Sequence, residues 1–181
     1  MPGSRYLPGV SIKVYCERNA MGRRNALGRR WLRDLAREGK IVLVLFPHDA
    51  DARQPHGVQL ATPSAVTWDS TSVTCDMTFL SSGAVASEKL EEIRRILRLP
   101  NEKVVEAPAG LIGEKTEGDA RLLDSAYKSG CRAFITTDRR TVLDHADLLE
   151  PLLGLRLFHP REEVGFRAFL DDALQASPPA A

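Results

Sequence analysis

The sequence of 181 residues predicts an α/β fold, built as a three-layer α/β/α sandwich around a central, mostly parallel sheet. Three observations support this prediction. Strand-like and helix-like segments alternate at the start of the chain, from residue 10 to residue 46. The second strand-like run, 41–46, is apolar at every position, as parallel strands covered on both faces are. A helix-like segment at 119–130 leads into another short strand-like run at 132–136.

The first elements form a predicted β-α-β unit. Residues 10–16 alternate in the way that is typical of a strand, and Glu17 follows at its end. The segment 20–38 has the spacing of an amphipathic helix, and Gly39 ends it before the strand at 41–46. Many of its arginines lie off the apolar stripe, so they form either a solvated face or a surface that contacts the phosphates of a nucleic acid. The stripe comprises Leu27, Trp31, Leu32 and Leu35, and the arginines are Arg23, Arg24, Arg29, Arg30, Arg33 and Arg37.

The middle of the chain has weaker patterns. Residues 47–83 are expected to be an insertion, in which the Thr, Ser and Val residues of 67–79 suggest a hairpin. A helix is expected to begin at Ser87, its N-cap, and to stop before Pro100, and 110–118 are expected to be a loop. The buried face of this helix is predicted to comprise Leu90, Ile93, Ile96 and Leu97.

The C-terminal half is predicted to complete the sheet. A helix is expected from Asp119 to Gly130, followed by a short buried strand at 132–136. A helical stretch at 140–153 and a last strand at 155–158 follow. The apolar residues at helical spacing are Leu122, Leu123, Ala126 and Tyr127.

Length and composition predict one domain in the cytoplasm. Residues 1–175 suffice for a single core, and 176–181 are expected to form a flexible tail. The net charge of +1 gives no overall reason to expect a polyanionic partner, so local charge has to supply one. The longest apolar run, 41–47, is too short to span a bilayer, and no segment resembles a signal peptide. Three widely separated cysteines predict neither a disulfide framework nor a thiolate metal site: Cys16, Cys75 and Cys131.

Four acids are predicted at strand ends or at the start of a helix. In a parallel α/β layer these positions meet at one edge of the sheet, so the four side chains can converge. Clustered carboxylates raise one another's pKa unless they share a cation, and oxygen ligands of this kind suit Mg²⁺ or Mn²⁺. The sequence therefore predicts a divalent metal site. The four acids are Glu17, Asp51, Asp119 and Asp138.

Each acid also has an explanation that involves no function. Asp119 can be a first-turn acid that interacts with the helix dipole. Asp138 can be a turn or N-cap aspartate for the helix that follows, and Glu17 and Asp51 can be solvated loop residues. Asp124, five residues beyond Asp119, points to another side of the helix and is expected to face solvent.

Around these acids the chain resembles the PIN-domain family. Residues 118–130 and 134–138 resemble the helix, the strand and the Thr-x-Asp arrangement of that family. The run 155–158 before Pro160 resembles its final strand. At the other end, 12–19 resembles its first strand, which in the family ends in Asp-Thr-Asn or Asp-Thr-Ser.

What the resemblance implies is a three-layer fold and metal-dependent cleavage of RNA phosphodiesters. The four acids would hold one or two Mg²⁺ or Mn²⁺ ions, which lower the pKa of a bound water and neutralise developing charge. Members of the family are often toxins of bacterial toxin–antitoxin pairs, so RNA and an antitoxin-like protein are implied as partners, and a homodimer is allowed. The implied substrate contacts are the arginines and threonines nearest to the site in sequence: Arg18, Arg23, Arg24, Thr136, Thr137, Arg139 and Arg140. Thr136 or Thr137 is expected either to orient an acid or to contact a phosphate.

Two acid exchanges leave a second hypothesis open. The family has Asp at the position of Glu17, and it usually has Glu at the position that Asp51 matches best. These two exchanges suit a PIN-like module that binds nucleic acid or a partner protein without cleavage. A dehalogenase-like nucleophile motif at Asp49 and Asp51 is discounted, because two residues separate it from the preceding strand. A zinc enzyme built on His48 and His56 is discounted because their spacing fits no common ligand pair.

Overall fold

The computed structural model describes residues 11–22, 25–45, 66–68, 86–99 and 109–176. They form a five-stranded sheet in the order β3-β2-β1-β4-β5, and every neighbouring pair is parallel. The predicted α/β fold with a central parallel sheet is therefore confirmed. The strands are β1 (Ile12–Cys16), β2 (Ile41–Leu45), β3 (Val66–Trp68), β4 (Ala133–Ile135) and β5 (Arg156–Phe158).

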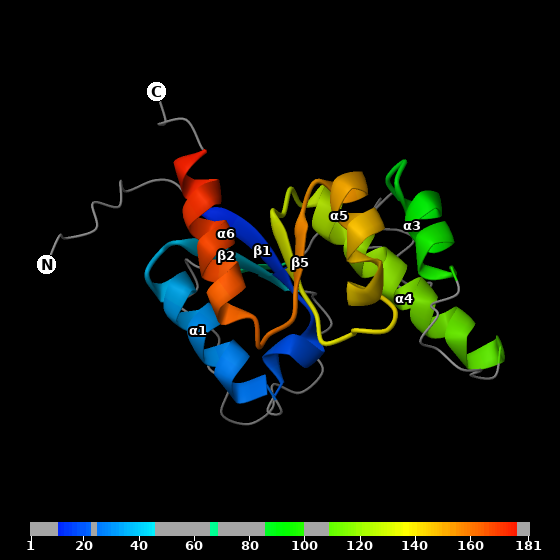
Figure 1. Cartoon of the computed structure of the whole chain (residues 1–181), viewed down its shortest axis with the longest axis horizontal. Helices are drawn as coiled ribbons and strands as arrows, with labels where there is room; N and C mark the ends of the chain where they lie inside the picture. Colours follow the sequence, from blue (N-terminus) through cyan, green and yellow to red (C-terminus); the bar gives the residue numbers. More distant parts are fainter. Residues whose placement is uncertain (1–10, 23–24, 46–65, 69–85, 100–108, 177–181) are drawn as a thin grey trace, which may run out of the picture.

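Helices cover both faces of the sheet, which gives the three predicted layers (Figure 1). One layer consists of α1 (Ala26–Arg37) and α6 (Glu163–Gln175). The other layer consists of α3 (Leu90–Leu97), α4 (Ala109–Lys128) and α5 (Ala146–Leu153). Two short 3₁₀ turns, η1 (Arg18–Met21) and η5 (Leu143–His145), follow β1 and precede α5. No helix in the described part of the chain is long and apolar enough to cross a membrane.

The two cores follow from the alternation of side chains along each strand. Val14 and Cys16 of β1 point to the layer of α1 and α6, whereas Tyr15 between them points to the layer of α3, α4 and α5. There Tyr15 stacks on Phe134 of β4, with ring centroids 5.4 Å apart. Because both faces are covered, the strands are apolar nearly throughout. Burial raises the pKa of the Cys16 thiol well above its usual range, so this cysteine stays protonated.

Close contact between α1 and the chain before α6 depends on Gly28. A Cβ atom at this position would lie 2.4 Å from the carbonyl oxygen of Pro160. The indole Nε1 of Trp31, one turn further along α1, donates a hydrogen bond of 3.0 Å to the same oxygen. The end of β5 is thereby fixed against α1.

We expect Gly28→Ala to lower the free energy of unfolding by about 1–3 kcal/mol, because the added methyl group forces the Pro160 backbone away from α1. Gly165→Ala in α6 is the control, since nothing lies within 4 Å of a Cβ atom there. In urea unfolding, that control should be as stable as the wild type or slightly more stable. A Gly28→Ala protein as stable as the control would contradict the contact.

The predicted start of the helix that carries Asp119 is wrong. Helix α4 begins at Ala109, so 110–118 are helical and not a loop, and Asp119 lies in the middle of the helix. The glycines of this segment suggested a loop, since each costs about 1 kcal/mol in a helix relative to alanine. Contacts with α3 offset that cost: Arg94 Nε donates to Glu117 Oε2 at 2.8 Å. Tertiary packing thus outweighs local propensity.

Other boundaries also differ from the expectation. Helix α1 begins at Ala26 after the turn η1, not at residue 20, and Leu27 is 79% exposed instead of lying on the buried stripe. Helix α3 begins at Leu90, and Ser87 is not its N-cap, although the Ser87 hydroxyl accepts the Lys89 N–H. Its predicted buried face is confirmed.

Further differences concern the sheet edges and the C-terminal helices. The expected hairpin is not seen where the structure describes this region, because β3 pairs in parallel with β2; 69–79 lie outside the described residues. The helical stretch expected at 140–153 is divided into η5 and α5. Helix α6 was not predicted. The rest of the expected insertion and the tail from 177 onward also lie outside the described residues, and the single domain over 1–175 stays a prediction.

Candidate functional site at the carboxyl edge of the sheet

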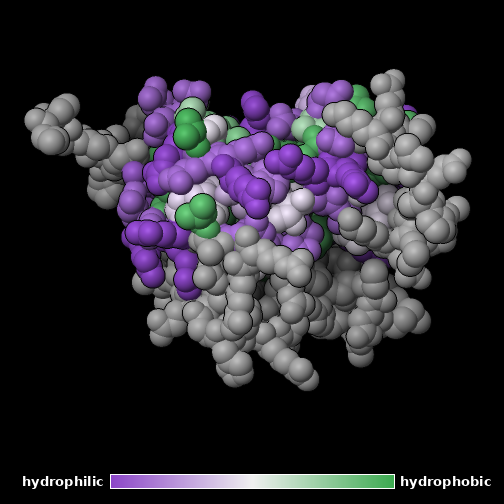
Figure 2. All heavy atoms as spheres, turned by 60° about the horizontal axis from the view of Figure 1, so that its bottom comes forward, coloured by the Kyte–Doolittle hydropathy of each residue, from purple (hydrophilic) through white to green (hydrophobic). Residues whose placement is uncertain are grey.

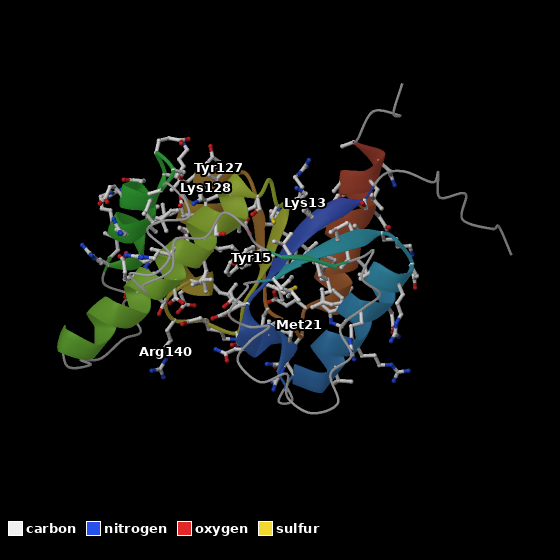
Figure 3. The ribbon with its side chains drawn as sticks, turned by 180° about the vertical axis from the view of Figure 1, so that it is seen from behind. Lys13, Tyr15, Met21, Tyr127, Lys128 and Arg140 are labelled. Atoms are coloured by element: carbon white, nitrogen blue, oxygen red, sulfur yellow. The ribbon has the colours of Figure 1, made fainter. Side chains whose placement is uncertain are left out.

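The carboxyl ends of the parallel strands gather at one edge of the sheet. In Figure 3, β1 runs from Lys13 through Tyr15 toward Met21, and Arg140 lies toward the same end of the molecule as Met21. Tyr127 and Lys128, at the end of α4, lie toward the opposite end. A sheet edge of this kind is the usual position of sites in α/β folds.

A buried threonine hydroxyl connects two of the expected acids. Thr136, 1% exposed, follows β4, and its Oγ1 donates to Glu17 Oε2 at 2.5 Å. The same Oγ1 accepts the backbone N–H of Asp138 at 2.9 Å. The backbone N–H of Glu17 donates to the Ile135 carbonyl at 3.0 Å. The ends of β1 and β4 are therefore joined, and the carboxylate of Glu17 is held in one orientation.

Asp138 also has a structural role. Its Oδ1 accepts the backbone N–H of Thr141 at 3.0 Å, and its carbonyl accepts the N–H of Leu143 at 3.0 Å. The expected alternative, an aspartate that stabilises the turn after the strand, thus describes part of what this residue does. A carboxylate has about four acceptor positions, so the turn hydrogen bond does not by itself exclude a ligand.

Asp119 reaches the same edge from α4. The Lys13 ammonium donates to the carbonyl of Ser129, just after α4, at 3.1 Å, which fixes the end of this helix at the amino edge of the sheet. Ten residues earlier, Asp119 lies about 15 Å back along the helix axis, away from this amino edge. It is 8% exposed and one turn from Leu123, which packs in the same core as Tyr15. Since it lies in mid-helix, the first-turn dipole explanation does not apply to it.

The remaining expected residues are only partly described. Thr137 is half-buried, and Arg139 and Arg140 are exposed just after Asp138. The described residues include no group of three or more His, Cys, Asp or Glu side chains that could hold a metal ion. The expected residues outside the described set are Asp51, Arg23, Arg24 and the side chain of Arg18.

Asp124 does not face solvent, contrary to the expectation. It is 2% exposed and accepts the backbone N–H of Ser87 at 3.2 Å as well as the Ser87 hydroxyl. The ammonium of Lys128 lies 3.3 Å from its Oδ2. Asp124 faces the chain that enters α3, so it fixes α3 against α4 instead of contributing to the edge.

Two polar residues after β5, His159 and Arg161, are not among those predicted from the sequence. His159 is buried, its backbone N–H donates to Glu162 Oε2 at 2.9 Å, and its Nδ1 accepts the N–H of Arg161 at 3.1 Å. Burial, reinforced by the charge of Arg139, lowers the pKa of His159, so the ring is neutral near pH 7. Arg161 itself is exposed. Both residues closely follow the last predicted strand, and that position at a strand end is the signal from which they could have been predicted.

No family model matches the sequence, and a search of curated proteins finds no match. The resemblance to the PIN-domain family therefore stays a prediction based on the residues quoted above.

Proposed function

We propose that this protein is a metal-dependent ribonuclease of the PIN-domain kind, which cleaves RNA phosphodiesters at the carboxyl edge of the sheet. The observation that supports this most is the Thr136 hydroxyl, which donates to the carboxylate of Glu17 after β1 and accepts the backbone N–H of Asp138 after β4. Asp119 approaches the same edge from α4. A carboxylate that is held in one orientation at a sheet edge, as Glu17 is, suits a cation site better than a solvated loop does.

The residues present fit a hard divalent cation. Glu17, Asp119 and Asp138 offer carboxylate oxygens only, which Mg²⁺ and Mn²⁺ prefer. Magnesium in phosphoryl-transfer sites is often held by one or two carboxylates plus waters and substrate phosphates, so a closed cage of protein ligands is not required. Asp51 is the proposed fourth acid. When bound, the ion would lower the pKa of a water and neutralise charge on the phosphate oxygens.

The remaining residues would hold the substrate and the acids. Arg139, Arg140 and Arg161 are exposed, and each lies within a few residues of the end of β4 or β5. Guanidinium groups there can contact RNA phosphates beside the acids. Figure 2 shows that the coloured surface on this side is mostly hydrophilic, with small hydrophobic patches. Thr136, whose hydroxyl donates to Glu17, would position that acid.

The proposal extends to the setting of the protein. As a ribonuclease of this kind it would act in the cytoplasm as the toxin of a toxin–antitoxin pair, with an antitoxin-like protein as partner and a homodimer as its assembly. Co-expression with the product of a neighbouring small reading frame should then relieve growth inhibition. Failure of every neighbouring product to do so would remove the toxin assignment without affecting the nuclease.

A second candidate function is a PIN-like module that binds RNA or a partner protein but does not cleave. The specific observation in its favour is that Glu17 Oε2 and Asp138 Oδ1 are both engaged in hydrogen bonds within the protein, as structural acids are.

One experiment separates the two functions. The full chain is incubated with single-stranded RNA in Mn²⁺ or Mg²⁺, with EDTA as the control. The nuclease should give fragments only with the metal. Retarded but intact RNA in a gel shift would support the binding module, and neither fragments nor retardation would contradict both.

Thr136→Val should lower the rate of RNA cleavage by about 10–100-fold, because groups that orient metal-binding acids typically contribute that much. Valine keeps the shape of the side chain but cannot hold Glu17. Thr136→Ser retains the hydroxyl and should stay within a few-fold of the wild type. The variants are compared by kcat and KM; a change confined to KM, or equal losses in both variants, would show that the hydroxyl does not position Glu17.

A further inference from the structure

A hollow lies at the amino edge of the sheet, where β4 and β5 begin. It is an open pocket of about 470 Å³ between α5 and α6, and its lining includes Arg132, Arg156 and Phe169. Arg132 precedes Thr136 by four residues, so the pocket is about 13 Å from the acids along the strand. Its volume falls within the range of sites for small organic ligands.

The apolar walls of the pocket are firmly held. The ring of Phe169 packs against Phe158 and Phe166, with centroid distances of 5.5 and 5.9 Å. Leu155, which is buried, and Pro151 of α5 complete the apolar lining. A flat or branched apolar group can therefore bind without first ordering these side chains.

The charge of the pocket is uneven. Arg156 Nε lies 2.9 Å from Glu150 Oε2, and Glu150 Oε1 accepts the backbone N–H of Leu157 at 2.9 Å, so this carboxylate neutralises Arg156. The backbone of Arg132 is fixed by hydrogen bonds to β1 and β5, but its guanidinium forms no ion pair with any residue that the structure describes. The three charged groups sum to one positive charge.

We propose that this pocket binds a small organic monoanion, a carboxylate that carries a flat or branched apolar group. The carboxylate contacts Arg132 in the bidentate manner that guanidinium groups favour, and the apolar group lies against Phe169 and Pro151. A single negative charge matches the single uncompensated guanidinium. The proposal is independent of the nuclease, because it uses no residue of the acidic edge.

The test uses 3-phenylpropionate as the probe, titrated into the full chain up to about 10 mM and followed by calorimetry and by backbone amide shifts. Saturable binding is expected, with shifts in Arg156 and Leu157, and the neutral analogue 3-phenylpropanol should bind at least about tenfold more weakly. Arg132→Gln should weaken binding of the acid by about tenfold or more. Arg98→Gln, which removes an exposed arginine elsewhere, should leave it unchanged.

The proposal would be overturned by the absence of saturable binding, by equal binding of the acid and the alcohol, or by unchanged binding in Arg132→Gln. Phe169→Leu provides a second variant, which should weaken the binding of 3-phenylpropionate and of 3-phenylpropanol to the same extent. Tighter binding of phenyl phosphate, a dianion, would contradict the assignment of a monoanion. RNA cleavage by Arg132→Gln should equal that of the wild type, so loss of either activity can be recognised separately.

Discussion

Asp119→Asn and Asp138→Asn are each expected to lower the rate of Mn²⁺-dependent RNA cleavage by about a thousandfold. A metal ion contributes several kcal/mol of charge stabilisation in the transition state, and each 1.4 kcal/mol or so corresponds to tenfold in rate. Asparagine keeps the shape of the side chain but removes the negative charge that holds a cation. The effect should therefore appear in kcat, measured on a single-stranded RNA substrate at saturating Mn²⁺.

The control for these variants is Asp172→Asn, which removes an exposed carboxylate on α6. It should cleave RNA at the rate of the wild type. Thermal unfolding should show that all three variants are folded at the temperature of the assay. Full activity in Asp119→Asn or Asp138→Asn would defeat the assignment of that acid to the site.

Phe166→Ala should lower the free energy of unfolding by about 3–5 kcal/mol, the largest effect on stability that we expect from a single substitution here. Phe166 is fully buried, and its ring lies 5.0 Å from that of Trp31 and 5.2 Å from that of Phe158. Its loss opens a cavity where α1, α6 and β5 meet. Urea unfolding followed by tryptophan fluorescence measures the change.

Val164→Ala, two residues earlier on α6, is the matched control because Val164 is 85% exposed. Its effect should stay within about 0.5 kcal/mol of zero. If Phe166→Ala were as mild as this control, the close packing of Phe166 against Trp31 and Phe158 would be contradicted.

The sheet could be predicted from the sequence because its strands carry their own pattern. Residues 41–46 are apolar on both faces, and 132–136 are short and bounded by glycine and charge, so both could be recognised without tertiary information. Parallel pairing follows once helices alternate with such strands. The register and the order of strands depend on contacts that no local pattern contains.

The helices were less predictable where tertiary packing determines their boundaries or the burial of their side chains. Helix α4 extends ten residues further toward its N-terminus than expected. Glu117 of α4 forms one ion pair with Arg94 of α3 and another with Arg121 within α4, and such contacts help to offset the cost of its glycines. Asp124 is buried because Ser87, distant in sequence, supplies its partners. Helix α6, in contrast, has Phe166, Leu170 and Ala173 at helical spacing, so the signal for it was present.

In the candidate site, too, some features follow from the sequence pattern and others depend on tertiary contacts. The positions of Glu17 and Asp138 at one sheet edge follow from the parallel order of β1 and β4. The hydrogen bond that joins Thr136 to Glu17 is a contact between two strands that are far apart in sequence, and no spacing predicts it. His159 and Arg161 come to the edge only because β5 pairs with β4.

The most direct test of the central claim is a titration of the full chain with Mn²⁺, with free ion followed by electron paramagnetic resonance. If the acids of the carboxyl edge form a cation site, the wild type should bind Mn²⁺ in a saturable way, Mg²⁺ should compete, and Glu17→Gln and Asp138→Asn should each bind it much more weakly than Asp172→Asn. Equal Mn²⁺ binding in all four proteins, or no binding in the wild type, would contradict the proposed site.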